Sequence, residues 1–234
     1  MKNSRILFCS RAVLMAALLF STSAMLLAGA PLICHPFEVG DAQSLPWGSG
    51  PGWKSPLAAY DVRALVPDTL ALLTPKTPVL VRMETMRRAA IYGERNPSGA
   101  NALLAVLMAR ALDAANSENA AAAWFDAGYL LETYRHAKGM RLRKAASNGA
   151  EDPIDGFSGY AWVVKSIKMA GGDPAMDFAA ALMSDGPWPN SHFRKALAGA
   201  SDGSLLARTL LSHYGEGRTK SVAELRQKFA ASSY

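Results

Sequence analysis

Cysteine and histidine are scarce in this sequence, and their scarcity excludes several kinds of chemistry. The 234 residues include two cysteines, Cys9 and Cys34, and four histidines. Cys9 falls in the N-terminal leader described below, so the rest of the chain has one thiol and no internal disulfide. No histidine lies three or four residues from another, which excludes the simple helical metal site. We therefore predict no metal and no cofactor.

The sequence also lacks the short motifs of the common enzyme classes. It contains no Cys-x-x-Cys, no His-Glu-x-x-His, no Gly-x-x-x-x-Gly-Lys-[Ser/Thr] phosphate loop and no Gly-x-Gly-x-x-Gly. Residues 156–160 resemble the Gly-x-Ser-x-Gly nucleophile turn, but Tyr160 replaces its second glycine and no strand is expected before it. We predict no catalytic residue and a non-catalytic protein.

Charge is absent from a long stretch near the N-terminus. Residues 12–33 carry no charged side chain, and Ala28-Gly29-Ala30 places small residues where signal peptidase requires them. The segment is preceded by three basic residues, Lys2, Arg5 and Arg11. We predict that residues 1–30 are a signal peptide and that the protein is exported, to the periplasm or beyond. An uncleaved anchor is the alternative, because residues 12–33 are long enough to cross a bilayer as a helix.

The positive charge of the chain is modest once the leader is set aside. The formal net charge is +6, from 25 basic and 19 acidic residues. Three of the basic residues belong to the leader, which leaves 25 − 3 = 22 against 19, a net charge of +3. That balance is ordinary for a protein surface, so we predict no nucleic-acid partner. Membrane contact is expected only if the leader is retained.

Residues 31–65, called the strap below, differ in composition from everything that follows. The segment 34–56 holds four prolines and four glycines, which exclude a long helix or a central strand. It also holds Phe37, Leu45, Trp47 and Trp53, which are too apolar for a free linker. We predict an extended strap that lies against the rest of the protein. A flexible spacer is the alternative.

Residues 66–234 have the composition and punctuation of an α-helical domain. Alanine, the best helix former, occupies many apolar positions, and Asp173-Pro174 is a capping residue followed by proline at the first helical position. Residues 96–99 are expected to form a turn before a helix over 100–115. We expect about eight short helices joined by short connections. The apolar residues of 100–115 cover most of a helix circumference, so this helix is predicted to be central and buried.

One helix supports a family resemblance. Residues 124–131, Trp-Phe-Asp-Ala-Gly-Tyr-Leu-Leu, resemble the first helix of a tetratricopeptide repeat, and Val163 and Ile167 resemble the second. About nineteen extra residues separate these halves, and no second clear copy is present. The resemblance implies stacked antiparallel helix pairs with Gly128 at a close helix contact, and it implies protein binding. An irregular all-α bundle is the alternative fold.

Aromatic and basic residues supply the candidate contacts for a partner. The candidates are Trp47, Trp53, Tyr129, Tyr134, Arg141, Arg143 and Lys144. Aromatic residues at helical spacing also occur in ordinary cores, and a basic cluster is also typical of a solvated helix end.

We therefore expect an exported, non-catalytic helical scaffold that binds a protein or peptide in the cell envelope. A membrane-anchored structural protein is one alternative. A glycan-cleaving enzyme with a glutamate acid is another, and Glu84, Glu94 and Glu132 are its candidates. Each glutamate is more simply interpreted as a solvated helix residue, and two have arginines at helical spacing, as Glu84 has Arg87 and Arg88.

Overall fold

The protein is almost entirely helical, as predicted. The computed structural model describes residues 31–50, 52–114, 117–142, 156–184 and 188–231, and the side chains of 139–142 are not described. These ranges contain ten α-helices, one 3₁₀ turn and no strand. The all-α prediction is confirmed at this level. The predicted signal peptide, residues 1–30, lies outside the described residues and stays a prediction.

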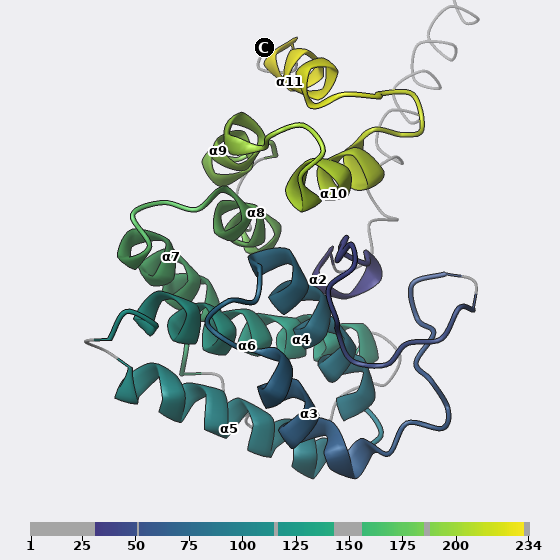
Figure 1. The fold of residues 1–234 in the computed structure, drawn as a ribbon, viewed down its shortest axis with the longest axis vertical. Helices are drawn as coiled ribbons and strands as arrows, with labels where there is room; N and C mark the ends of the chain where they lie inside the picture. The colour runs from purple at the N-terminus through teal and green to yellow at the C-terminus, as the bar shows by residue number, and fades with distance from the viewer. Residues whose placement is uncertain (1–30, 51, 115–116, 143–155, 185–187, 232–234) are drawn as a thin grey trace, which may run out of the picture.

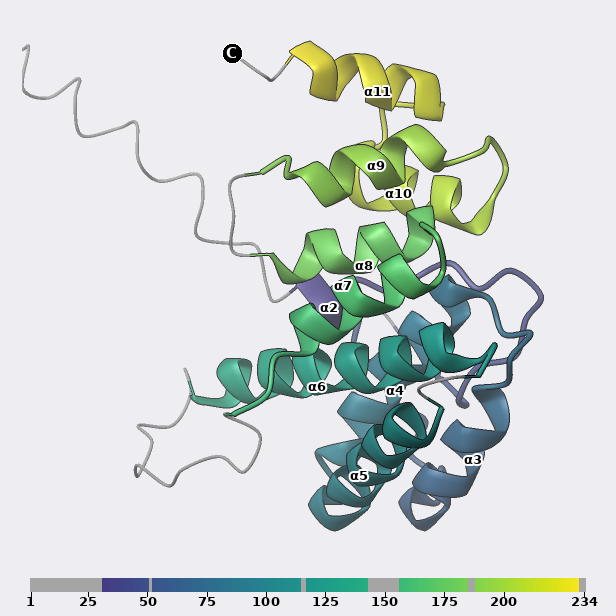
Figure 2. The same cartoon turned by 90° about the vertical axis from the view of Figure 1, so that its left-hand side faces the viewer.

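The helices from α5 to α11 are spread along the long axis of the molecule, with α5 at one end, α11 at the other, and α9 and α10 at a similar height (Figures 1 and 2). Their bounds are α2 Pro31–Cys34, η1 Val62–Ala64, α3 Leu65–Leu72, α4 Val79–Gly93, α5 Pro97–Asp113, α6 Ala120–Leu142, α7 Gly159–Met169, α8 Pro174–Met183, α9 Ser191–Gly199, α10 Leu205–Tyr214 and α11 Val222–Ala231. Helix α6 packs against α4, α5 and α7, and α8 packs against α7 and α9. The strap begins with the helical turn α2 and is not extended throughout.

Side-chain caps set where several helices begin. The Asp173 carboxylate accepts hydrogen bonds from the backbone N–H groups of Ala175 and Met176 at the start of α8. Asn96 caps α5 in the same way, through the N–H of Gly99. Both helices have proline in the first turn, where its missing N–H costs nothing. Helix α5 therefore begins at Pro97, three residues before the predicted start.

The central helix is α4, and the prediction that residues 100–115 form it is wrong. Every residue of α4 from Leu80 to Gly93 except Arg88 is buried. Helix α5 buries a single stripe, and Leu112 on its outer side is 66% exposed. The leucines of α5 are numerous but only those three or four residues apart share a face, so one side of the helix still meets water.

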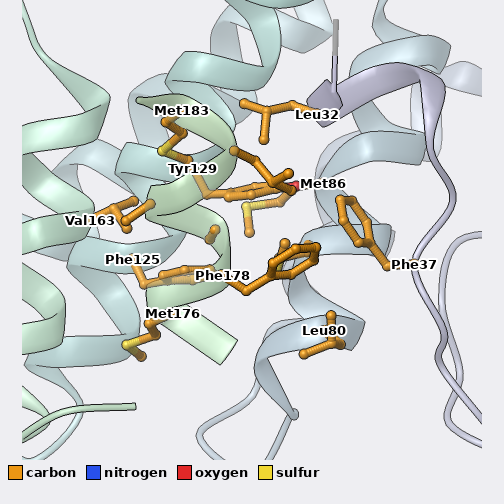
Figure 3. Close-up of a cluster of buried hydrophobic side chains, with 14 of the residues drawn as sticks. Leu32, Phe37, Leu80, Met86, Phe125, Tyr129, Val163, Met176, Phe178 and Met183 are labelled. Atoms are coloured by element: carbon orange, nitrogen blue, oxygen red, sulfur yellow. The ribbon is translucent and has the colours of Figure 1, made fainter. Parts of the chain in front are cut away.

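The core is built around four aromatic rings from three parts of the chain, the strap, α6 and α8 (Figure 3). Phe125 and Tyr129 of α6 stack with ring centroids 5.5 Å apart. Phe37 of the strap meets Tyr129 and Phe178 edge-on, at 6.5 and 6.3 Å. Leu32 of α2 is also fully buried there. The beginning of the strap, with Leu32 and Phe37, is therefore part of the core.

Helices α6 and α7 approach each other through glycine, as the resemblance implied for Gly128. A Cβ atom built on Gly128 would lie 2.6 Å from the backbone oxygen of Gly159 and 2.9 Å from Cβ of Trp162. Only a residue without a side chain allows this backbone contact. The local reason for the glycine is thus visible in the fold.

Among the described residues of 31–231, no helix is both long enough and apolar enough to cross a bilayer.

Candidate peptide-binding site

The strap runs along helix α4 in an irregular, mostly extended path. Residues 47–56 turn back on themselves, closed by an isolated bridge between Trp47 and Pro56 and by a hydrogen bond from the Gly48 N–H to the Ser55 oxygen, at 2.8 Å. This turn is otherwise not part of any sheet or helix. The strap must therefore be held by the side chains of the helices beneath it.

A buried charged cluster on α4 lies under the strap. The Glu84 carboxylate accepts hydrogen bonds from Nε and Nη2 of Arg87, at 2.7 and 2.8 Å, and from Nε of Arg88 at 2.7 Å. It also accepts one from the backbone N–H of Phe37, at 3.0 Å. Glu84 and Arg87 are fully buried.

The interpretation of Glu84 as a solvated helix residue is therefore wrong. The helical spacing that led to the interpretation does form the ion pairs with Arg87 and Arg88. What the spacing omits is the strap, which covers α4 and removes the cluster from water. Burial of such a charge is tolerated because every partner is present and hydrogen-bonded.

The same side chains bind the strap by its main chain. Arg87 Nη1 donates to the backbone oxygens of Ile33 and Trp53, at 3.1 and 2.9 Å. Arg88 Nη1 donates to the oxygen of Leu45 at 2.6 Å. These bonds join residues between 34 and 54 positions apart in the chain.

Tyr92, one turn further along α4, extends this recognition of the main chain. Its hydroxyl donates to the oxygen of Pro46 at 2.5 Å and accepts from the backbone N–H of Leu57 at 2.9 Å. One phenol thus joins the two ends of the turn formed by 47–56.

Helix α10 holds the first part of the strap in the same manner. Thr209 Oγ1 accepts from the N–H of Glu38 at 3.1 Å, and His213 Nε2 bonds the oxygen of Pro36 at 2.9 Å. Since a carbonyl oxygen accepts only, the Nε2 atom of His213 must carry the proton. Burial is the main reason that the pKa of His213 is lowered to about 4; the hydrogen bond to Pro36 opposes the shift, and the neighbouring His35 ring, 4.9 Å away, adds to it.

Two predicted partner-binding residues, Trp47 and Trp53, lie in this region. The Trp47 ring faces the guanidinium groups of Arg87 and Arg88, at 5.0 and 5.5 Å from its centroid. Trp53 is half-buried and supplies the carbonyl that Arg87 binds. The structure therefore brings these two together above α4.

The predicted tyrosines lie elsewhere. Tyr129 is fully buried in the core, where its hydroxyl has no hydrogen-bond partner and burial raises its pKa well above the ordinary value. Tyr134 is half-buried and its hydroxyl donates to the oxygen of Ala100 at 3.1 Å. Both therefore belong to the packing between helices.

The predicted basic residues Arg141, Arg143 and Lys144 are not placed. Arg141 belongs to α6, which continues to Leu142, but its side chain is not described. Arg143 and Lys144 lie outside the described residues.

The two remaining candidate acids also have structural partners. Glu94 pairs with Lys54 of the strap at 2.7 Å. Glu132 pairs with Arg135 at 2.7 Å and accepts from the N–H of Gly159, at the start of α7, at 2.8 Å. Across the described residues, no three or more histidine, cysteine, aspartate or glutamate side chains gather in a way that could hold a metal ion.

A buried ion pair and a histidine–carboxylate hydrogen bond between helices were not predicted. Arg82 of α4 and Asp126 of α6 pair at 2.6 Å with both side chains buried, and His192 Nδ1 lies 2.6 Å from Asp177 Oδ1 between α9 and α8. The partners are 44 and 15 residues apart. No short spacing in the sequence signals such pairs.

Together the fold and the site define a class: an all-α protein whose N-terminal strap is held against its helices largely by side-chain contacts to the main chain. Searches with protein-family models, against curated proteins and against solved structures gave no match. The tetratricopeptide resemblance stays a prediction.

Proposed function

We propose that the protein is an exported, non-catalytic helical scaffold that binds an extended segment of a protein or peptide partner in the cell envelope. The stack of helix pairs that resembles tetratricopeptide repeats would supply the scaffold. The surface formed by α4, α10 and the strap would supply the binding site.

The main-chain recognition of the strap is the observation that carries the proposal. Arg87, Arg88 and Tyr92 bind five backbone groups of the strap, the oxygens of four residues and the N–H of Leu57. Main-chain contacts give affinity for an extended chain, while pockets for a few side chains give specificity. This arrangement is suited to binding extended polypeptide.

The contacts of the three candidate acids favour binding over glycan cleavage. A general acid must donate a proton to the leaving group. Glu84, Glu94 and Glu132 instead each accept hydrogen bonds from an arginine or lysine side chain. Those contacts give each carboxylate a structural role.

Site-specific photo-crosslinking tests the proposal. A benzophenone side chain at Leu57, 41% exposed on the strap, should crosslink to a partner in cells that produce the protein. The same group at Leu112, 66% exposed on α5, is the matched control and should give no adduct. Mass spectrometry of the adduct identifies the partner. Equal labelling from both leucines, or no adduct from Leu57 under any growth condition, contradicts the proposal.

The alternative activity and the location have their own measurements. Zymography on peptidoglycan should show no clearing by the wild-type protein. Clearing that is lost in Glu84→Gln, Glu94→Gln or Glu132→Gln would replace the proposed function by the enzyme. Intact-protein mass spectrometry should give a chain without residues 1–30, and a retained leader would instead support an anchored protein.

A further inference from the structure

Two parts of the strap are held very differently. Residues 32–37 place Leu32, Ile33 and Phe37 in the buried interior. The segment 44–57, called the lid loop below, contributes Leu45 alone among its described residues, and its other side chains are half-buried or exposed. If the lid loop left α4, one buried side chain would be exposed, together with the partly buried Trp47 and Trp53, against three buried side chains for residues 32–37.

The surface under the lid loop carries a surplus positive charge. Arg87 and Arg88 share one carboxylate, Glu84. Neither guanidinium bonds another carboxylate among the described residues. The remaining charge is met by the backbone oxygens of Ile33, Leu45 and Trp53 and by the face of the Trp47 ring.

Those contacts are weaker than the ones a carboxylate would make. Arginine binds a carboxylate through two parallel hydrogen bonds and is also attracted by its full negative charge, whereas Arg88 donates only one hydrogen bond to a carbonyl of the lid loop. The Arg88 side chain is 17% exposed, so an anion can reach it from solvent. An acidic occupant would complement this surface better than the lid loop does.

We propose that the lid loop is a displaceable cover and that the surface beneath it binds an extended, acidic segment of a partner polypeptide. A carboxylate of the partner pairs with Arg88 and Arg87, in place of the oxygens of Leu45 and Trp53. Tyr92 bonds the main chain of the partner, and an apolar side chain fills the space of Leu45. Residues 32–37 remain in the core throughout. This inference rests on the proposed function and assigns its partner class.

A reversible disulfide provides the test. The Ser44 and Thr85 hydroxyl oxygens are 3.1 Å apart, so cysteines at these two positions lie close enough for a bond that closes the lid loop on α4. The full chain would carry S44C and T85C, with Cys9 and Cys34 changed to serine. Binding of a fluorescein-labelled peptide, Ala-Glu-Glu-Leu-Glu-Glu, is measured by anisotropy before and after reduction.

The reduced protein should bind this peptide at least tenfold more tightly than the oxidised protein. A peptide with glutamine at each glutamate should bind the reduced form at least tenfold more weakly. Arg88→Gln in the reduced form should abolish the difference between the two peptides, and Arg88→Lys should keep part of it because the charge remains. Arg218→Gln, which removes an exposed arginine between α10 and α11, is the matched control and should change nothing.

Circular dichroism and thermal unfolding establish that each variant is folded, so that loss of binding is not loss of structure. Equal binding to the oxidised and reduced forms would show adhesion to the general surface and overturn the inference. Absence of binding to the folded, reduced protein would overturn it as well. Dimerisation of the reduced protein without peptide would assign the surface to a second copy. In each case crosslinking from Leu57 still reports separately on the proposed function.

Discussion

Buried charges decide how individual residues of α4 contribute to stability. Arg82 donates to Asp126 and to the backbone oxygens of Thr74 and Thr77. Burial raises the pKa of Asp126 to about 6, although the Arg82 guanidinium opposes the shift. Because both side chains are out of water, each is acceptable only while the other is present.

Removing one partner of this pair should therefore be costly. Asp126→Ala should lower the free energy of unfolding by about 3–5 kcal/mol, because it leaves a buried guanidinium without its counter-charge. The double variant Arg82→Met, Asp126→Leu should lose less free energy of unfolding than Asp126→Ala alone, because it leaves no unpaired buried charge. Urea denaturation of Arg82→Met, Asp126→Leu and the variant with both changes gives the coupling energy. Strictly additive losses would show that the two residues act independently.

His213 makes the attachment of the strap sensitive to acid. Its folded pKa of about 4 lies below the ordinary value of 6.5, so the unfolded chain takes up the proton first as pH falls. The stability from neutral His213 is complete above about pH 6.5 and is lost progressively towards pH 4. When the pH is lowered from 7 to 4.5, the free energy of unfolding of the wild-type protein should fall by about 2 kcal/mol more than that of His213→Gln. Urea denaturation of both proteins at the two pH values measures this difference. An equal fall in the free energy of unfolding for the variant and the wild type would contradict the prediction.

At the level of single residues, sequence spacing predicts local pairs and no others. Glu84 with Arg87 and Arg88, and Glu132 with Arg135, follow from helical spacing. The burial of Glu84 and Arg87 does not follow from spacing, because it depends on the strap, whose Phe37 lies 47 residues before Glu84 in the chain. Trp47 and Trp53 were found because an aromatic side chain in a segment rich in proline and glycine needs a surface to pack on.

Helices and their contacts form the next scale. The start of α8 was predicted because the capping Asp173 and the following proline act locally. The same combination begins α5 at Pro97, where a turn was expected. Which helix becomes central is not predictable in this way. It depends on which other elements cover each face of the helix. The polar residues of α4 suggest an exposed face from the sequence, but the strap and α6 cover that face in the structure.

The crossing of α6 and α7 depends on one glycine. Gly128→Ala should lower the free energy of unfolding by about 2–3 kcal/mol, because its Cβ would meet backbone atoms of Gly159 and Val163 that cannot move alone. In an open helix the same change would instead stabilise by up to about 1 kcal/mol. Thermal unfolding with Ala122→Gly, a change at a half-buried position of α6, isolates the propensity effect. A rise in stability for Gly128→Ala would show that the helices are not in contact there.

At the scale of the whole molecule, the strap and the helices form one core. Leu32, Phe37 and Leu45 belong to the same buried cluster as Tyr129 and Phe178. The composition of the strap differs from that of the rest of the chain, which is why the sequence suggests a separate segment. The composition of the strap limits which local structures it can form. Whether the strap belongs to the core depends on its contacts with helices that are distant in the sequence.

Two truncations should therefore behave differently. A chain that starts at Tyr60 loses the burial of Leu32, Ile33, Phe37 and Leu45, worth about 1.5–3 kcal/mol each. Their sum is comparable to the whole stability of a typical domain, about 5–15 kcal/mol, so this chain should unfold without a sharp transition. Replacing residues 46–56 by a short Gly-Ser linker removes no fully buried side chain among the described residues of that segment, and this protein should keep a cooperative transition in urea. A sharp unfolding transition for the chain that starts at Tyr60 would contradict this prediction. It would show that the helices form a stable core by themselves and that the buried side chains of the strap add little to the free energy of unfolding.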